Sequence, residues 1–326
     1  MSLRGCKILV TGAAGFIGSH TVEWLAGCGA DVRAMVRYSS QGGIGWLEGM
    51  AAKHSIIYGD VRDIGSVRRA CEGVDAVVHL AALMSIPYSY TAPEAYLSTN
   101  VVGTHNVLVA AQERGVKRIV CVSTSEVYGT PETVPIRETH PRNPQSPYAA
   151  TKVGADALCR AHYCAYNTPV VVVRPFNTYG PRQSTRAVIP HMLLQLIDGK
   201  AEISIGNPDA VRDFTFVTDT AHAFALAVAT PDIEGQEVQL GTGDVCSIRD
   251  LFAMCRMVVG ADSAQLVTSP QLLRPDASEV KRLQSDPSRA KAMLAWEPYI
   301  TLATGLKITA EWLRENQDKY RRHFYE

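Results

Sequence analysis

Nine residues near the amino terminus decide the fold: Val10-Thr11-Gly12-Ala13-Ala14-Gly15-Phe16-Ile17-Gly18. They follow a short apolar run and open a helical stretch, which predicts a strand, a tight turn and a helix in that order. In such a unit the glycines allow the turn, and the free N–H groups at the helix N-terminus bind a pyrophosphate. The stretch therefore predicts a dinucleotide site that includes Gly12, Gly15, Phe16, Ile17 and Gly18.

The same strand-and-helix rhythm continues through the first half of the chain. Short, continuous apolar runs predict six parallel strands covered on both faces: Lys7–Val10, Asp31–Arg37, Ser55–Tyr58, Ala76–Leu80, Arg118–Ser123 and Val170–Arg174. Helices are expected between them, notably over Phe16–Ala26, Tyr96–Arg114 and Pro147–Asn167, and a terminal helix over Leu302–Asn316. This alternation predicts an α/β fold with a Rossmann-type, doubly wound parallel sheet.

After about residue 175 the alternation of predicted strands and helices ends, and loops interrupted by prolines follow. A length of 326 residues suits two domains. We expect residues 1–175 to form a dinucleotide-binding domain, completed by segments around 207–235. Residues 176–326 are expected to form, in the main, a smaller substrate-binding domain at the C-terminus.

Composition excludes several classes of function. Lys plus Arg number 32 and Asp plus Glu number 32, so the chain lacks the basic excess that nucleic-acid binding requires. No apolar run approaches the ~18 residues of a membrane-spanning helix. The eight cysteines form no CxxC pair and have no zinc-ligand spacing, which predicts free thiols in the cytoplasm and no metal site.

The end of the second predicted strand bears on the choice of dinucleotide. Met35-Val36-Arg37-Tyr38-Ser39-Ser40 contains no acidic residue for the ribose hydroxyls, whereas Arg37 and Ser39 suit a 2′-phosphate. We therefore expect NADP, with NAD as the alternative if Arg37 merely covers the sheet edge. Asp60 and Val61, after the third strand, are expected to contact the adenine.

A second group of residues is suited to acid–base chemistry. Tyr148 and Lys152 are spaced i and i+4, so they share one helical face. A cation near a phenol favours the phenolate and makes it usable as a base near neutral pH. Ser123-Thr124-Ser125-Glu126 follows a predicted buried strand, and adds hydroxyls and a carboxylate to the same predicted site.

Together these motifs resemble those of the extended short-chain dehydrogenase/reductases, the nucleotide-sugar epimerase/dehydratase family. The resemblance covers nearly the whole chain and rests on Thr11–Gly18, Asp60–Asp63, His79–Ala82, Asn100 with Gly103-Thr104, Ser123–Gly129, Tyr148–Lys152, Arg174–Arg182, Arg212–Phe214, Val217 to Asp219, Arg274-Pro275 and Trp296–Pro298. It implies that Tyr148, assisted by Lys152 and Thr124, removes the O4 proton of a sugar while hydride passes from C4 to a tightly bound, recycled nicotinamide.

The fate of the 4-keto sugar separates the subfamilies. Thr124-Ser125-Glu126 resembles the Thr-Asp-Glu of dTDP-glucose 4,6-dehydratases and the Thr-Ser-Glu of GDP-mannose 4,6-dehydratases. It implies that Glu126 takes the C5 proton and protonates the C6 oxygen, with help from Ser125. UDP-glucuronate decarboxylases carry a similar triplet. A 4,6-dehydratase is thus the first hypothesis, with a C4 epimerase, a decarboxylase of a nucleotide-linked uronic acid and a non-catalytic cofactor-binding protein as alternatives.

Two further stretches narrow the subfamily. Ser85–Tyr90 and Arg182–Pro190 resemble 4,6-dehydratases of the legionaminic acid pathway, which implies a nucleotide-linked N-acetylhexosamine, or otherwise a hexose. The family pattern adds cofactor contacts at Leu80, Ala81, Ala82, Tyr148, Lys152 and Pro175, and substrate contacts at Ser85, Tyr88, Asn177, Val188, Arg212 and Arg274. It also implies a homodimer in which helices over Tyr96–Arg114 and Pro147–Asn167 form a four-helix bundle.

Overall fold

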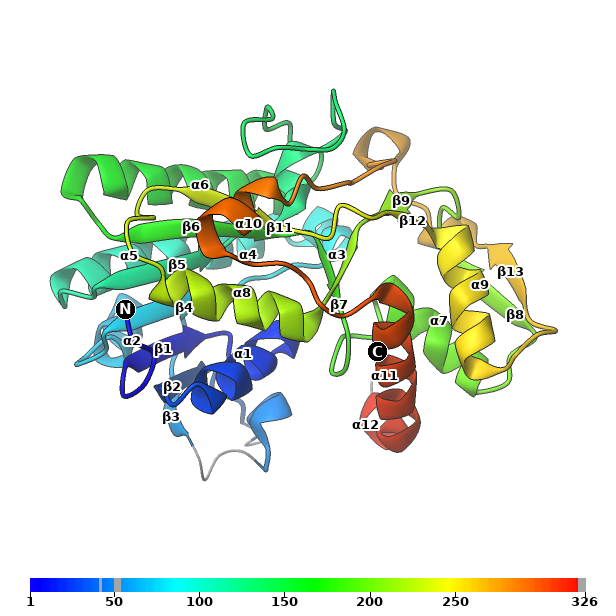
Figure 1. Cartoon of the computed structure of the whole chain (residues 1–326), viewed down its shortest axis with the longest axis horizontal. Coiled ribbons are helices and arrows are strands. Elements are labelled where there is room, and N and C mark those ends of the chain that lie inside the picture. The colour runs from blue at the N-terminus through cyan, green and yellow to red at the C-terminus, as the bar shows by residue number, and fades with distance from the viewer. Residues whose placement is uncertain (41–42, 50–53, 322–326) are drawn as a thin grey trace.

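A parallel seven-stranded sheet forms the centre of the computed structural model, which describes residues 1–40, 43–49 and 54–321 (Figure 1). The strand order is β11-β6-β5-β4-β1-β2-β3. The bounds are β1 Lys7–Thr11, β2 Asp31–Val36, β3 Ser55–Tyr58, β4 Ala76–His79, β5 Arg118–Val122, β6 Val170–Pro175 and β11 Glu237–Leu240. The Rossmann-type fold and all six predicted strands are confirmed, and the strand order reverses beside β1, where such sheets bind ligands.

Successive residues of the strands enter different cores, because side chains alternate across a sheet. Ile8 and Val10 join one buried cluster and Leu9 joins another. The first cluster is closed by α1 Phe16–Gly27, α8 Val217–Ala229 and α10 Ser288–Leu294. The second is closed by α2 Ile64–Ala70, α5 Gly103–Glu113 and α6 Pro147–Tyr166. The carboxyl ends of the strands remain between these two helical layers.

The predicted helix over Tyr96–Arg114 is interrupted. It consists of α4 Pro93–Tyr96, a π-helical turn η3 Leu97–Val102, and α5. The buried side chain of Asn100 lies in this turn and hydrogen-bonds outside it, to Leu83 and Thr151. Single π-turns within helices occur frequently at functional sites. The helix α6, by contrast, begins as predicted, with Ser146 accepting a hydrogen bond from Ala149 N and Pro147 in the first turn.

A smaller lobe follows β6 and lies to the right in Figure 1. Its elements are β7 Asn177–Tyr179, α7 Val188–Ile197, β8 Glu202–Ile205, β9 Val211–Arg212, β10 Phe214–Phe216, β12 Cys246–Ser247, α9 Ile248–Val259, β13 Gln265–Thr268, η5 Pro270–Leu272, η6 Asp276–Ser278, α11 Leu302–Glu315 and α12 Gln317–Arg321. Its core includes Leu193, Phe252, Leu306 and Leu313. The strand β11 and the helix α8 also follow residue 175, yet they pack in the sheet portion.

Two features join the smaller lobe to the sheet portion. Phe16 and Ile17, at the start of α1, pack against the core of the smaller lobe. Trp46, in the short helix η1 Gly45–Leu47, contacts Trp312 of α11 edge-on, with ring centroids 5.3 Å apart, and Tyr320 of α12 at 5.8 Å. The glycine-rich turn therefore lies at the junction of the two parts.

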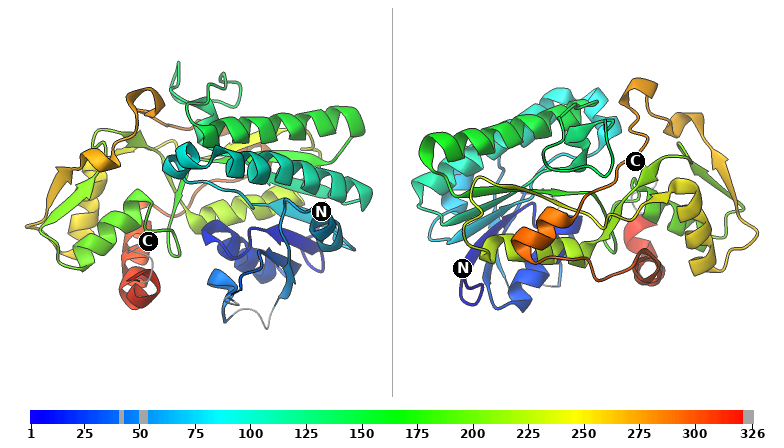
Figure 2. Two further views of the ribbon diagram at one scale, coloured as in Figure 1. Left: turned by 180° about the vertical axis from the view of Figure 1, so that it is seen from behind. Right: turned by 45° about the horizontal axis from the view of Figure 1, so that its top comes forward.

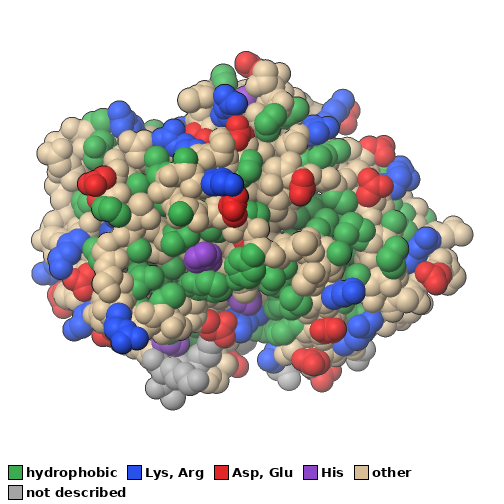
Figure 3. All heavy atoms as spheres, in the orientation of Figure 1, with side chains coloured by type: hydrophobic (Ala, Val, Ile, Leu, Met, Phe, Trp, Pro, Cys, Tyr) green, Lys and Arg blue, Asp and Glu red, His purple; other side chains and the backbone are tan. Residues whose placement is uncertain are grey.

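The surface bears no extended patch of one charge on the face seen in Figure 3, where basic and acidic side chains lie interspersed. In the described part of the chain, no helix is long and apolar enough to cross a membrane.

Candidate active site

The glycine-rich turn connects β1 to α1. Gly12 has a φ of +69°, and a Cβ there would lie 2.8 Å from Ala81 N, so neither the backbone nor the space admits a side chain. A Cβ at Gly18 would collide with the carbonyl oxygen of Gly12. Gly15 precedes α1, and no side chain caps the helix at that position. The N–H groups of the first turn, at Phe16 and Ile17, can therefore bind an anionic pyrophosphate.

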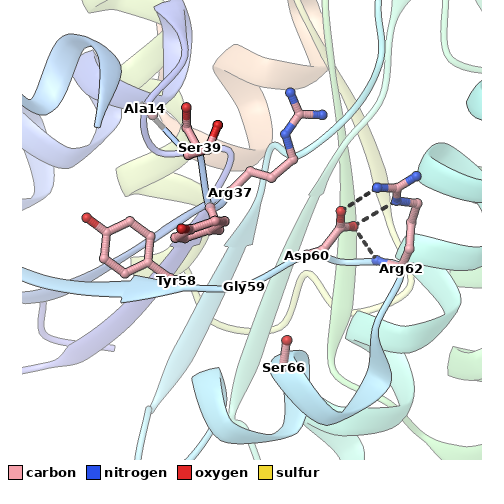
Figure 4. Close-up of a pocket in the computed structure, with 10 residues that line it drawn as sticks. Ala14, Arg37, Ser39, Tyr58, Gly59, Asp60, Arg62 and Ser66 are labelled. Atoms are coloured by element: carbon pink, nitrogen blue, oxygen red, sulfur yellow. Dashed lines mark hydrogen bonds and ion pairs between the residues drawn. The ribbon is translucent and has the colours of Figure 1, made fainter. Parts of the chain in front are cut away.

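A cavity of about 860 Å³ lies beside this turn, at the carboxyl ends of β2 and β3 (Figure 4). The predicted residues Arg37, Ser39 and Asp60 line it. Figure 4 shows Arg37 extended away from Tyr58, and Asp60 bound to Arg62. The sequence argument missed Tyr58 and Arg62, although Arg62 stands in the quoted stretch Asp60–Asp63.

The side chain of Asp60 in this cavity is paired with Arg62. Its carboxylate accepts hydrogen bonds from Arg62 Nε at 3.0 Å, Nη2 at 2.6 Å and the backbone N at 2.9 Å. These contacts lower the pKa of Asp60, with a smaller contribution from the charge of Arg37. Val61 is buried behind it, and its carbonyl accepts a hydrogen bond from Asn106 Nδ2. The cavity thus presents two guanidinium groups, one of them held by a carboxylate.

The predicted acid–base residues converge at the end of β5. Tyr148 lies on α6, and Thr124 precedes the short helix η4 Ser125–Tyr128. Burial raises the pKa of Tyr148, the Thr124 hydroxyl opposes this by hydrogen-bonding the phenol, and the charge of Glu126 raises the pKa further. Lys152 is buried on the same helix, and its ammonium donates to Val122 O at 2.7 Å, at the end of β5. The expected lowering of the phenol pKa by this cation is therefore not seen in this structure, where burial dominates and raises the pKa of Tyr148.

A buried ion-pair network holds α6 against the sheet. Arg174 on β6 is fully buried and donates to Asp156 on α6 at 2.8 Å and to Tyr128 Oη at 2.9 Å. Asp156 also accepts from Ser123 Oγ at 2.9 Å. The residue that follows β5 and the helix that carries Tyr148 therefore share one set of polar contacts. Removing a partner from such a network leaves a buried charge uncompensated.

Glu126 faces a pair of cations from the smaller lobe. Its carboxylate is 4.0 Å from Arg274 Nη1, and that nitrogen is buried without a hydrogen-bond partner. Glu279 lies 3.9 Å from Arg274 Nε and 3.4 Å from Arg212 Nη2. The two predicted phosphate-binding arginines are therefore close together, and Glu279, which was not predicted, lies between them. Ser125 is buried next to Glu126.

The remaining predicted substrate residues lie around this centre. Tyr88 and Tyr148 are linked through Tyr96, with ring centroids 6.1 Å and 6.2 Å apart, and Tyr96 Oη donates to Ser85 O. Asn177 Nδ2 donates to Asp213 O, next to Arg212. Val188 is the first residue of α7, and Pro175 ends β6.

Three predicted cofactor residues follow β4. The backbone N–H groups of Leu80 and Ala81 donate to Thr11 Oγ1 at 3.2 Å and 3.1 Å, and Ala82 is half-buried beyond them. The end of β4 is thereby fixed to the glycine-rich turn at the end of β1.

Known proteins resemble this chain over nearly its whole length. Residues 9–309 match the family model described as GDP-mannose 4,6 dehydratase. The chain is 34% identical to a dTDP-glucose 4,6-dehydratase of Streptomyces griseus, over 95% of this chain and 94% of that protein. It is 33% identical to a UDP-glucose 4-epimerase of Mycolicibacterium smegmatis, over 94% and 98% of the two chains.

A solved structure extends the likeness to three dimensions. The dTDP-glucose 4,6-dehydratase DesIV of Streptomyces venezuelae, with NAD and TYD bound, superposes with a TM-score of 0.87. The two chains are 32% identical, and the match covers 97% of this chain and 99% of that one.

Proposed function

Since the chain belongs to the extended short-chain dehydrogenase/reductases that include nucleotide-sugar dehydratases and epimerases, we propose that it is a nucleotide-sugar 4,6-dehydratase. The observation that carries the proposal is the half-buried Glu126, which lies near enough to Tyr148 to affect the pKa of the phenol. The base that forms the 4-ketone and a second base for the next proton are thus adjacent. We propose an N-acetylhexosamine or a hexose as the sugar.

The reaction follows from these positions. Tyr148, hydrogen-bonded to Thr124, takes the O4 proton. A dinucleotide held by the glycine-rich turn would supply the hydride acceptor for C4 and the hydride for C6. The 4-ketone acidifies the C5 proton, which Glu126 removes and delivers to the C6 oxygen as water leaves, with Ser125 beside it. Arg212 and Arg274 would hold the diphosphate, since guanidinium groups bind phosphate oxygens bidentately.

Products formed in deuterated water test this proposal. Candidate nucleotide sugars are incubated with the protein, and the product mass and the label at C5 are recorded. We expect the loss of one water and the gain of deuterium at C5. An unchanged mass without deuterium, together with an inverted C4, would instead establish an epimerase, which the 33% identity to a UDP-glucose 4-epimerase keeps as the second candidate. Loss of carbon dioxide would establish a decarboxylase.

We propose NADP as the cofactor. The relative DesIV was solved with NAD, so the proposal rests on this chain's own cavity. Arg37 lies free to extend into it, because Asp60 is already paired with Arg62. Ser39 and Ser40 add hydroxyls beside Arg37. This set matches the three oxygens and the charge of a 2′-phosphate.

Replacing Arg37 with Asp tests the cofactor. We expect NADP to bind ~10- to 100-fold more weakly, because a charge-assisted contact contributes about 1.5–3 kcal/mol, while NAD binding changes little. Dissociation constants for both dinucleotides, measured by calorimetry, give the ratio. Arg33→Ala is the matched control, since Arg33 lies on β2, just before Arg37, but donates to Ala70 O and Glu72 O. Equal binding of the two dinucleotides by the unmodified protein would count against a phosphate role.

We further propose a homodimer through the outer faces of α5 and α6. These helices run side by side as an outer layer of the sheet portion (Figure 2). Leu97 and Val102, in the turn η3 before α5, and Tyr166, the last residue of α6, are 54%, 45% and 58% exposed, so apolar side chains are available for a partner subunit to cover. A light-scattering mass of twice 35.4 kDa is expected.

The eight thiols are unpaired, which supports the cytoplasm as the proposed location.

A further inference from the structure

A directed row of hydrogen bonds joins the glycine-rich turn to the helix that carries Tyr148. Its first member is Thr11 Oγ1, which accepts from the N–H groups of Leu80 and Ala81. Both backbone donors point at this oxygen, so its own proton must go elsewhere. The remaining contact is His79 Nδ1 at 2.8 Å. The Thr11 hydroxyl therefore donates, and His79 Nδ1 is an acceptor without a proton.

The protonation state of His79 determines the direction of the next hydrogen bond, to Thr104. With Nδ1 unprotonated, Nε2 carries the proton and donates to Thr104 Oγ1 at 3.1 Å. Thr104 in turn donates to Asn100 O at 2.6 Å, which leaves its oxygen free to accept from His79. His79 is 2% exposed, and burial, with the nearby charge of Lys152, lowers its pKa to about 3. The imidazole is neutral and has one tautomer.

The direction set by His79 ends at the backbone carbonyl of Asn100, and the side chain of the same residue makes the contact to α6. Its amide Nδ2 donates to Thr151 Oγ1 at 3.1 Å and to Leu83 O, while Oδ1 accepts from Leu83 N. Thr151 then donates to Tyr148 O at 2.7 Å. The π-helical turn η3 carries Asn100, and Thr104 follows it at the start of α5. Thr11, His79, Thr104, Asn100 and Thr151 are all buried, so water does not compete for these contacts.

We propose that His79 is a positioning residue: as the neutral Nε2–H tautomer it accepts from Thr11 and donates to Thr104, which ties the cofactor turn to the segment that carries Asn100 and so keeps α6 and Tyr148 in register with that turn. The proposal rests on Tyr148 as the base of the proposed function. It differs from a packing role because a side chain of similar size that cannot both accept and donate would fill the space but break the row. A small displacement of Tyr148 would slow C4 oxidation, since catalysis is sensitive to shifts near 1 Å.

Isosteric variants separate the two links. In His79→Asn the amide oxygen replaces Nδ1 and keeps the bond from Thr11. In His79→Gln the amide nitrogen replaces Nε2 and keeps the bond to Thr104, and His79→Leu keeps neither. We expect the rate of C4 oxidation, measured in single turnovers by nicotinamide absorbance, to fall ~10- to 100-fold in the Leu variant and less in the other two. The substrate KM should not change, and the pH profile of this step should shift because Tyr148 moves relative to Thr124.

A second pair of variants, both at Thr104, tests the proposal if the His79 variants do not fold. Thr104→Val preserves the shape and removes the hydroxyl, whereas Thr104→Ser restores it. We expect the Val variant to lose rate and the Ser variant to regain it. Wild-type rates and pH profiles in folded His79→Leu or Thr104→Val protein would overturn the proposal.

The tautomer is testable without turnover. Long-range ¹H–¹⁵N spectra of the imidazole should show His79 as neutral with the proton on Nε2 from about pH 5 to about pH 9, a range in which an ordinary histidine titrates. A proton on Nδ1, or titration in that range, would overturn the proposal. If the unmodified protein oxidises no sugar but shows this tautomer, the proposed function fails and the directed row stands.

Discussion

Glu126→Gln is expected to lower the release of the 4-keto-6-deoxy product by ~10²- to 10⁴-fold, the usual contribution of a positioned acid–base group. C4 oxidation should persist, because Tyr148 and Thr124 are unchanged. The negative charge of Glu126 raises the pKa of Tyr148. Its removal should therefore lower that pKa and move the pH profile of C4 oxidation to lower pH. Product mass, deuterium at C5 and single-turnover cofactor reduction measure the three effects.

The matched control is Glu132→Gln, a neighbouring exposed glutamate in the same segment of chain. It should leave both steps at the wild-type rate. Elimination at full rate in Glu126→Gln would show that another group removes the C5 proton. A parallel loss of C4 oxidation would show instead that the Glu126 side chain, 4.0 Å from Arg274, organises substrate binding rather than the second proton transfer.

Tyr148→Phe is expected to abolish the first step, again by ~10²- to 10⁴-fold. Dehydration must fall with it, because the C5 proton becomes acidic only after the ketone forms. Cofactor binding should persist in large part, because the glycine-rich turn and the cavity beside β2 are unchanged in this variant. Single-turnover absorbance and calorimetry separate the two quantities. Tyr163→Phe, on the same helix, should behave as wild type. Retained C4 oxidation in Tyr148→Phe would mean that the O4 proton leaves by another route.

Local patterns in the sequence predicted the parts of the fold that depend on neighbouring residues. The six strands are continuous apolar runs, and the start of α6 is marked by Ser146 and Pro147, so both were visible in the sequence. The seventh strand, β11, was missed. It is short, carries Glu237 and Gln239 on an edge of the sheet, and pairs with β6 only through distant folding.

The missed features of the site have the same cause. The π-helical turn depends on Asn100 reaching Leu83 and Thr151, which lie 17 and 51 residues away. Glu279 meets Arg212 only because separate segments of the smaller lobe fold together. The glycine positions follow from a motif with fixed spacing, and the Tyr148–Thr124 contact was implied by the family resemblance. Directions of hydrogen bonds, such as that at His79, required the coordinates.

The contact between Trp46 and Trp312 also has an optical consequence. One indole lies beside the glycine-rich turn, with Trp46 N donating to Ala14 O, and the other lies on a helix of the smaller lobe. Indole emission depends on what the ring touches, so any change in the angle between the two parts alters the fluorescence of this pair. The Trp46–Trp312 pair would therefore report, without a label, any such change when a ligand binds.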